Sequence, residues 1–166
     1  MVKIEKVKIM YQNNPVEAQK LTVSSIIPID LEKAWAKVKT SALLEFVTKG
    51  MVKFKPLNDN FPTVWTEGDI IQTRSLLFGF IPFGDIHTLV FIKIDDKNKI
   101  LQTKEYDDVA KVWNHTITMK EINKNTIFYV DEITIYGGFL TFFITLWAKF
   151  FYEHRQRRWI LVSKNS

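Results

Sequence analysis

His115 is the side chain with the clearest scope for acid–base chemistry, because it lies in a strongly alternating segment. From residue 109 to 119 the odd positions are mostly bulky, whereas the even positions are mostly small or polar. Side chains of a β-strand alternate between its two faces, so His115 is predicted to face the core beside Trp113 and Ile117. A buried imidazole there could act as a base, bond a ligand oxygen, or serve as a core residue tied to a carboxylate.

Two adjacent acids, Asp131 and Glu132, lie on the strand predicted to follow. Which acid meets His115 depends on the register of the hairpin that the two strands form. If the residue numbers of each pair sum to an even number, Asp131 or Ile133 faces His115; if they sum to an odd number, Glu132 does. A carboxylate in contact with the imidazole would orient the ring and hold one tautomer. Such a pair would serve either structure or catalysis.

Arg74 and His87 are the other candidates for a polar contact with a ligand. Each alternates with apolar residues in a β-rich segment, but both faces of these segments are mixed. If they point inward, they could supply a positive charge to a carboxylate or phenolate. Glu105 is then the expected partner of Arg74.

Metal and cofactor sites have little support in the sequence. The chain has no cysteine, and its three histidines lie far apart without the spacing of a metal site. No glycine-rich phosphate loop and no nucleophile-elbow serine is present. We therefore predict neither a metal nor a cofactor, and we assign no catalytic residue.

The elements that must position these side chains are mostly β-strands. Residues 2–11 and 21–29 read as extended segments separated by a turn at Asn13, Asn14 and Pro15. Whether residues 2–11 add a strand to the sheet is left open. Asp30 is expected to cap a helix over 31–38, and a second short helix over 42–48 begins at Ser41 and ends at Gly50.

A run of strands joined by turns follows these two helices. The predicted strands are 52–56, 70–81, 86–94, 100–106, 109–119 and 127–136, with a loop over 58–62. Turn signals at hairpin spacing, with no helix between them, indicate an antiparallel sheet of sequentially connected strands.

A long helix is predicted after Gly137 and Gly138. Apolar residues at 139, 142, 143, 146, 147, 150 and 151 cover more than one helical stripe, which needs a large surface to lie on. We expect this helix to lie across the sheet and enclose a cavity. The expected lining includes Trp113 and His115, together with the helix residues Phe142, Phe143, Leu146 and Phe150.

Length and composition indicate one domain over residues 1–166, with 46% hydrophobic residues and a net charge of +5. The apolar run of the last helix is interrupted at Lys149, short of the ~20 residues of a membrane span, so no stable membrane insertion is expected. Arg155, Arg157 and Arg158 suit the negative end of a helix dipole, and nucleic-acid binding is not expected. The first residues lack the pattern of a signal peptide, which predicts a cytoplasmic protein.

The order of these elements resembles the helix-grip fold of the START and birch-pollen-allergen-like (SRPBCC) superfamily, which includes polyketide cyclases and dehydrases. The similar stretches are Ile-Pro-Ile-Asp at 27–30, Lys-Ala-Trp at 33–35, Trp-Thr-Glu-Gly-Asp at 65–69, Trp-Asn-His at 113–115, Tyr-Val-Asp-Glu-Ile at 129–133 and Phe-Tyr-Glu-His-Arg at 151–155. The resemblance implies an α+β fold with a curved antiparallel sheet around the long helix. It also implies a cavity for an apolar small molecule, with Asp131 as the inward acid. We count Tyr129 and Asp131 among the predicted ligand-binding residues.

Three functions remain open at this stage. The first is binding of a hydrophobic or amphipathic small molecule, lipid- or polyketide-like, for which the aromatic content of 14% is suited. The second is a cyclase or dehydrase in which His115 and an acidic partner move protons. The third is an interaction domain that forms a homodimer, or binds another protein, through an exposed apolar face of the last helix.

Overall fold

The computed structural model describes residues 1–58 and 60–164; Asp59, in the predicted loop, and residues 165–166 of the predicted domain lie outside the described residues. The described chain forms eight strands and three helices. In order they are β1 (Val2–Tyr11), β2 (Asn14–Ile27), α1 (Leu31–Val38), α2 (Ser41–Thr48), β3 (Val52–Pro56), β4 (Ile70–Leu77), β5 (Ile81–Asp95), β6 (Ile100–Tyr106), β7 (Val112–Asn123), β8 (Thr126–Tyr136) and α3 (Thr141–Ser163).

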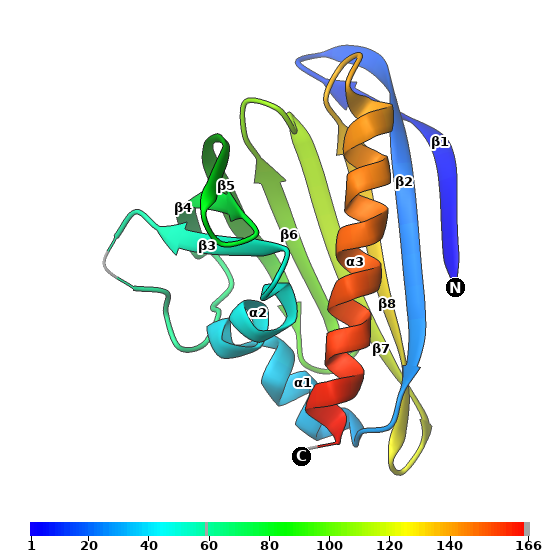
Figure 1. Cartoon of the computed structure of the whole chain (residues 1–166). Coiled ribbons are helices and arrows are strands. Elements are labelled where there is room, and N and C mark those ends of the chain that lie inside the picture. The colour runs from blue at the N-terminus through cyan, green and yellow to red at the C-terminus, as the bar shows by residue number, and fades with distance from the viewer. Residues whose placement is uncertain (59, 165–166) are drawn as a thin grey trace.

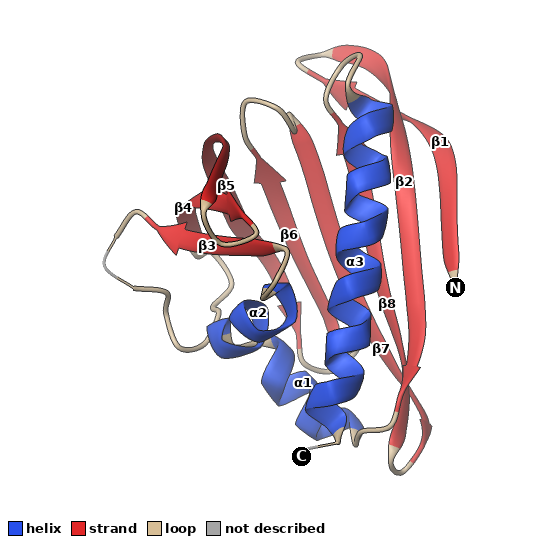
Figure 2. Ribbon diagram, viewed as in Figure 1, coloured by secondary structure: helices blue, strands red, loops and turns tan. Residues whose placement is uncertain are grey.

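All eight strands belong to one antiparallel sheet with the order β1-β2-β8-β7-β6-β5-β4-β3. From β3 to β8 the strands pair in sequence, as the turn signals predicted. The sheet curves around α3, which runs along its concave side (Figure 1). All three helices lie on this same side, with α1 and α2 near the end of the sheet reached by the last turns of α3 (Figure 2). The predicted helix-grip fold is confirmed.

The N-terminal strand adds to the sheet as an edge strand. β1 pairs with β2 from Val2 opposite Val23 to Tyr11 opposite Asn14. In β1 no side chain is fully buried. The sheet therefore extends one strand beyond the part that α3 covers.

The two short helices begin and end close to the predicted residues. The Asp30 carboxylate accepts a hydrogen bond from the backbone N–H of Lys33 at 3.0 Å, which caps α1. The second cap is Thr40 rather than Ser41; its hydroxyl accepts from the N–H of Leu43 at 3.2 Å. Gly50 follows α2 with φ of 96°, a conformation that glycine adopts without strain.

The orientation of α3 differs from the prediction. The face toward the sheet carries small, polar and a few aromatic residues: Thr141, Thr145, Ala148, Phe151, Tyr152, Arg155, Gln156, Trp159 and Ser163 are buried. The large residues predicted to face the sheet point outward instead, with Phe142 60%, Phe143 65%, Leu146 40% and Phe150 52% exposed. The expectation that these four line the cavity is therefore wrong.

Close approach of α3 to the sheet explains this orientation. A Cβ atom on Gly137 would lie 2.2 Å from the Cδ1 atom of Ile144 and 2.7 Å from the carbonyl oxygen of Val109. The helix thus starts directly against the end of β8. Thr141, Thr145 and Ala148 are small enough to fit this narrow gap, and phenylalanine is not.

The buried apolar residues form two clusters on the concave side. One lies around α1 and α2 and includes Trp35, Val47 and Trp65. The other lies beneath the middle of α3 and includes Trp113 and Phe151. Among the helices that the structure describes, none is long and apolar enough to cross a membrane.

Candidate functional site

His115 faces the interior, as strand alternation predicted. It lies opposite Ile133 in the β7–β8 pairing, so the register is the even one. Asp131 is two residues along β8 on the same face, and its Oδ1 atom lies 2.8 Å from Nε2 of His115. The predicted contact between the histidine and Asp131 is present, and Glu132 pairs with Lys20 on the other face of the sheet.

Asp131 is the centre of a buried network that ties α3 to the sheet. Its carboxylate also accepts hydrogen bonds from the Tyr129 hydroxyl at 3.1 Å and from Nε2 of Gln156 at 2.9 Å. Gln156 bonds in addition to the carbonyl of Val23 and to the Ser25 hydroxyl. Burial disfavours the carboxylate, but the His115 hydrogen bond and the charge of Arg155 outweigh it and lower the pKa of Asp131.

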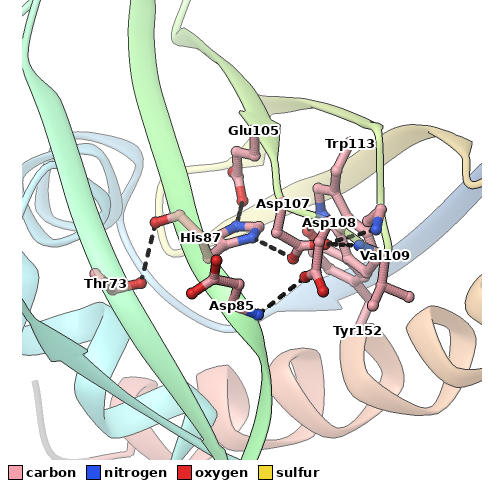
Figure 3. A network of polar contacts seen from close by, with 10 residues as sticks. Thr73, Asp85, His87, Glu105, Asp107, Asp108, Val109, Trp113 and Tyr152 are labelled. Atoms are coloured by element: carbon pink, nitrogen blue, oxygen red, sulfur yellow. Dashed lines mark hydrogen bonds and ion pairs between the residues drawn. The ribbon is translucent and has the colours of Figure 1, made fainter.

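A second polar group lies on the inner face of β5 and β6 (Figure 3). His87 is held between two acids: Nδ1 lies 2.9 Å from Asp107 and Nε2 lies 3.0 Å from Glu105. Burial disfavours the imidazolium, but the hydrogen bonds to Asp107 and Glu105 outweigh it and raise the pKa of His87 to about 9. His87 is therefore a cation at neutral pH.

The two acids beside His87 have other partners as well. Glu105 accepts a hydrogen bond from the Thr103 hydroxyl at 2.6 Å, and Asp107 accepts two from the backbone N–H groups of Val109 and Ala110. Burial raises the pKa of both carboxyls, and the bonds to His87 overcome it, so both pKa values are lowered. Among the described residues, no group of three or more histidine, cysteine, aspartate or glutamate side chains is placed to hold a metal ion.

Two small chambers lie between the sheet and α3, on either side of Phe54 and Glu105. The first has a volume of about 80 Å³ and is mainly apolar, with His87, Glu105 and Asp107 as its polar part; its lining includes Phe54, Phe83, Ala110, Trp113, Ile144 and Trp147. The second has a volume of about 60 Å³ and is lined by residues that include Phe54, Trp65, Phe91, Glu105, His115 and Arg155. Phe54 and Glu105 line both, so the chambers are neighbours.

The structure brings together three of the predicted binding residues around these chambers. His87 and Trp113 line the first, and His115 lines the second. The Trp113 indole N–H donates to the Tyr152 hydroxyl at 3.0 Å, which fixes one wall against α3 (Figure 3). Tyr129 and Asp131 are fully buried behind His115 and line neither chamber.

Arg74 is the clearest correction among the polar candidates. It lies on the exposed face of β4, because Thr73 is the residue that turns inward beside His87. Its predicted partner, Glu105, bonds to His87 instead. Strand alternation could not decide this, since both faces of β4 carry polar residues.

Asp107 and Arg155 were not assigned to the site by the sequence, and Glu105 was considered only as a partner of Arg74. Asp107 and Glu105 flank His87, and Arg155 lies in the second chamber rather than at a solvated helix end. A signal for Glu105 exists in β6, where Leu101, Thr103 and Glu105 alternate toward the core. For Arg155 the signal is its helical spacing from Ala148, Tyr152 and Trp159, which share the buried face.

No protein-family model matches the sequence, and no curated protein matches it. Solved structures match the fold over most of the chain. A norcoclaurine synthase from Thalictrum flavum, solved with dopamine and hydroxybenzaldehyde, is 12% identical with a TM-score of 0.63 and covers 89% of this chain and 87% of that chain.

Two further solved structures extend this likeness. A START superfamily protein from Mycobacterium smegmatis has a TM-score of 0.62 at 8% identity, covering 88% of this chain and 97% of that one. A major latex-like protein from Panax ginseng has a TM-score of 0.58 at 11% identity, covering 89% and 97%. At these identities the likeness shows the shared fold, which is the one that the sequence motifs indicated.

Proposed function

We propose that this protein binds a hydrophobic or amphipathic small molecule between the sheet and α3, in the cytoplasm. The observation that carries this proposal is the pair of neighbouring chambers, which combine apolar walls with a few buried polar side chains. Such a combination is typical of small-molecule sites, where apolar surface supplies affinity and a few polar groups fix orientation. A protein of the same fold has been solved with dopamine and hydroxybenzaldehyde, which are single-ring molecules.

The size of the chambers limits the ligand. Volumes of about 80 and 60 Å³ are well below the roughly 300–1,000 Å³ of pockets that hold drug-sized molecules. A single ring with a short side chain is the ligand that suits these volumes best. A longer lipid- or polyketide-like molecule would require Phe54, which lies between the chambers, to move aside.

The test is a titration with a neutral single-ring probe, cinnamyl alcohol, followed by ligand-observed NMR. Ala110 lines the first chamber and is buried, so Ala110→Leu fills part of that space. We expect this change to weaken binding by about tenfold or more, because the leucine side chain occupies space that the probe would fill. Ala36→Leu, on the exposed side of α1, is the matched control and should bind like the wild type.

Equal binding by all three proteins would place the probe outside the chambers and contradict the proposal. Absence of binding to the wild type would contradict it too. Native mass spectrometry of the freshly purified protein supplements this test, because a co-purified molecule would have its mass measured directly.

An acid–base enzyme of the cyclase or dehydrase kind is a second candidate. The contact of 2.8 Å between His115 and Asp131 favours it, because a carboxylate that holds one ring nitrogen leaves the other to meet a substrate. Phenylacetone in D₂O provides a test: a base in the chamber should accelerate exchange of its α-protons. Exchange no faster with the wild type than with His115→Gln would exclude this role for His115.

An interaction domain is the third candidate, and the outward face of α3 favours it. Phe142, Phe143 and Phe150 are each at least half exposed on α3, and Phe139, just before the helix, is exposed as well. A second copy of the chain is the partner that this hypothesis predicts. Sedimentation of the wild type and of the double variant Phe142→Ser, Phe143→Ser tests it: a monomer in both cases would contradict a homodimer.

A further inference from the structure

Arg155 is a buried cation that contacts aromatic rings and has no hydrogen-bonding partner in the described part of the chain. Its residue is 7% exposed, and it projects from α3 into the second chamber. Among residues 1–58 and 60–164, no hydrogen bond or ion pair to its guanidinium is formed. Its contacts are with aromatic rings: the Cζ atom lies 4.9 Å from the ring centroid of Tyr152 and 5.8 Å from that of Phe151. A guanidinium has five N–H donors, so most of its hydrogen-bonding capacity is unused.

The nearest acids do not fill this role, because their oxygens are already committed. Asp131 accepts from His115 and Tyr129 on one oxygen and from Gln156 on the other. Glu105 accepts from Thr103 on one oxygen and from His87 on the other. Both acids stabilise the positive charge of Arg155 through space, and they outweigh the burial that would lower its pKa. Neither provides a direct contact.

We propose that Arg155 binds a carboxylate of the ligand, so that the small molecule of the proposed function is a compact organic acid. An isolated buried charge is costly unless it is paired and hydrogen-bonded, and a carboxylate matches the planar fork of a guanidinium with two parallel bonds. The second chamber, of about 60 Å³, has room for such a group but not for a bulky one. This inference rests on the proposed function and specifies its ligand class.

The arrangement of the chambers gives the bound acid a direction. The carboxylate lies at Arg155 in the second chamber, and the apolar body extends past Phe54 toward Trp113 and Trp147 in the first. His115 also lines the second chamber; its Nε2 is held by Asp131, and its Nδ1 has no hydrogen-bond partner in the described part of the chain. Nδ1 is thus available as a second polar contact beside Arg155.

The experiment compares two probes of nearly equal shape, cinnamate and cinnamyl alcohol, by calorimetric or NMR titration. The wild type should bind cinnamate about tenfold to a hundredfold more tightly than the alcohol, the range for a hydrogen bond to a charged group. Arg155→Met should bring the affinity for cinnamate down to about that for the alcohol, so that the preference for the acid is lost. Arg157→Met, the same change at an exposed position of the same helix, should keep the preference.

A purely structural role for Arg155 predicts a different pattern. In that case Arg155→Met would have a lower melting temperature in the absence of any probe, and its affinity for cinnamate and for the alcohol would fall by similar factors. Should Arg155→Met fail to fold, the wild type still tests the ligand class, because cinnamate should raise its melting temperature and the alcohol at equal concentration should raise it less.

The two proposals can fail separately. If the wild type binds both probes equally, or if the preference for cinnamate survives in Arg155→Met, the anchor is wrong and the proposed function stands. If the wild type binds neither probe, the proposed function itself is contradicted, and the anchor falls with it.

Discussion

His87 is a histidine whose charge is set by two acids, and this makes stability depend on pH. Its pKa is raised to about 9 in the folded protein, from about 6.5 for a free side chain. The stabilisation is fully present below pH about 6.5 and is lost as pH rises through about 9. We expect the free energy of unfolding to fall by up to about 3 kcal/mol across this window. Urea unfolding at several pH values measures it.

Two variants separate this effect from general alkaline destabilisation. His87→Gln removes the titrating group and should flatten the slope, although the variant is less stable overall. His154→Gln changes a histidine that lies at the surface and contacts the carbonyl of Lys49, so it should keep the wild-type slope. Parallel curves for wild type and His87→Gln would show that His87 does not cause the dependence.

His115 is predicted to matter for stability through Asp131. Removing the imidazole in His115→Ala leaves a fully buried carboxylate with only Tyr129 and Gln156 as donors. We expect a loss of about 3 kcal/mol, at the lower end of values for a broken buried pair, because two donors remain. Urea unfolding measures this loss, and Asn114→Ala, on the exposed face of the same strand, is the control.

The binding role of His115 needs a separate measurement on the same variant. A weaker affinity for cinnamyl alcohol or cinnamate, measured where the variant is folded, would support it. Unchanged affinity together with the loss of stability would show that the histidine is structural only.

For single residues, the sequence predicted which side chains face inward wherever a strand has one clearly bulky face. Alternation placed Trp113 and His115 inward, because β7 has one bulky face. It could not orient Arg74, whose strand is mixed, and it could not find the contact of His87 with Asp107, which depends on a turn that folds back at the end of β6.

α3 shows why a helix of this kind is difficult to orient from its sequence. Two faces repeat with helical spacing: one is large and apolar, and the other consists of Thr141, Thr145, Ala148 and Tyr152. A prediction based on hydrophobicity alone buries the first face against the sheet. The second face packs against the sheet: near Gly137 only small side chains such as Thr141 and Thr145 fit, and farther along the helix the larger Tyr152 is buried on the same face.

This orientation predicts opposite effects on the two faces of α3. Ala148→Leu adds volume at a fully buried position against the sheet and should cost about 1–3 kcal/mol. Phe143→Ser removes a large apolar side chain that is 65% exposed and should change the free energy of unfolding by only about 0.5 kcal/mol. Thermal or urea unfolding of the two variants tests this. A larger loss for Phe143→Ser would indicate that the outward face is covered.

For the whole molecule, the two ends of the chain contribute unequally to the core. α3 buries Phe151, Tyr152 and Trp159, each worth about 1.5–3 kcal/mol, against a typical net stability of about 5–15 kcal/mol. A chain truncated before Gly138 should therefore not unfold cooperatively. A chain that lacks residues 1–11 loses only partly exposed side chains and should still show a cooperative transition.

These two truncations are controls for one another, and circular dichroism during urea unfolding follows both. A cooperative transition in the chain without α3 would mean that the sheet has another cover.

The overall architecture was predictable because turns between sequential strands specify most neighbours. The pairing of β2 with β8 was not predictable from turns, since no turn connects these two strands.

That pairing also sets the order in which the protein is able to assemble. Val23 of β2 pairs with Asp131 of β8, so a ribosome must make most of the chain before β2 meets this partner. Pairings so distant in sequence are slow to form, because a long loop must close first. The β1–β2 hairpin is local and forms early, which occupies one side of β2 while the chain is still being synthesised. The free edge of this hairpin is β1, which carries Lys3, Lys6 and Lys8. These charges oppose edge-to-edge pairing between nascent chains on the same polysome.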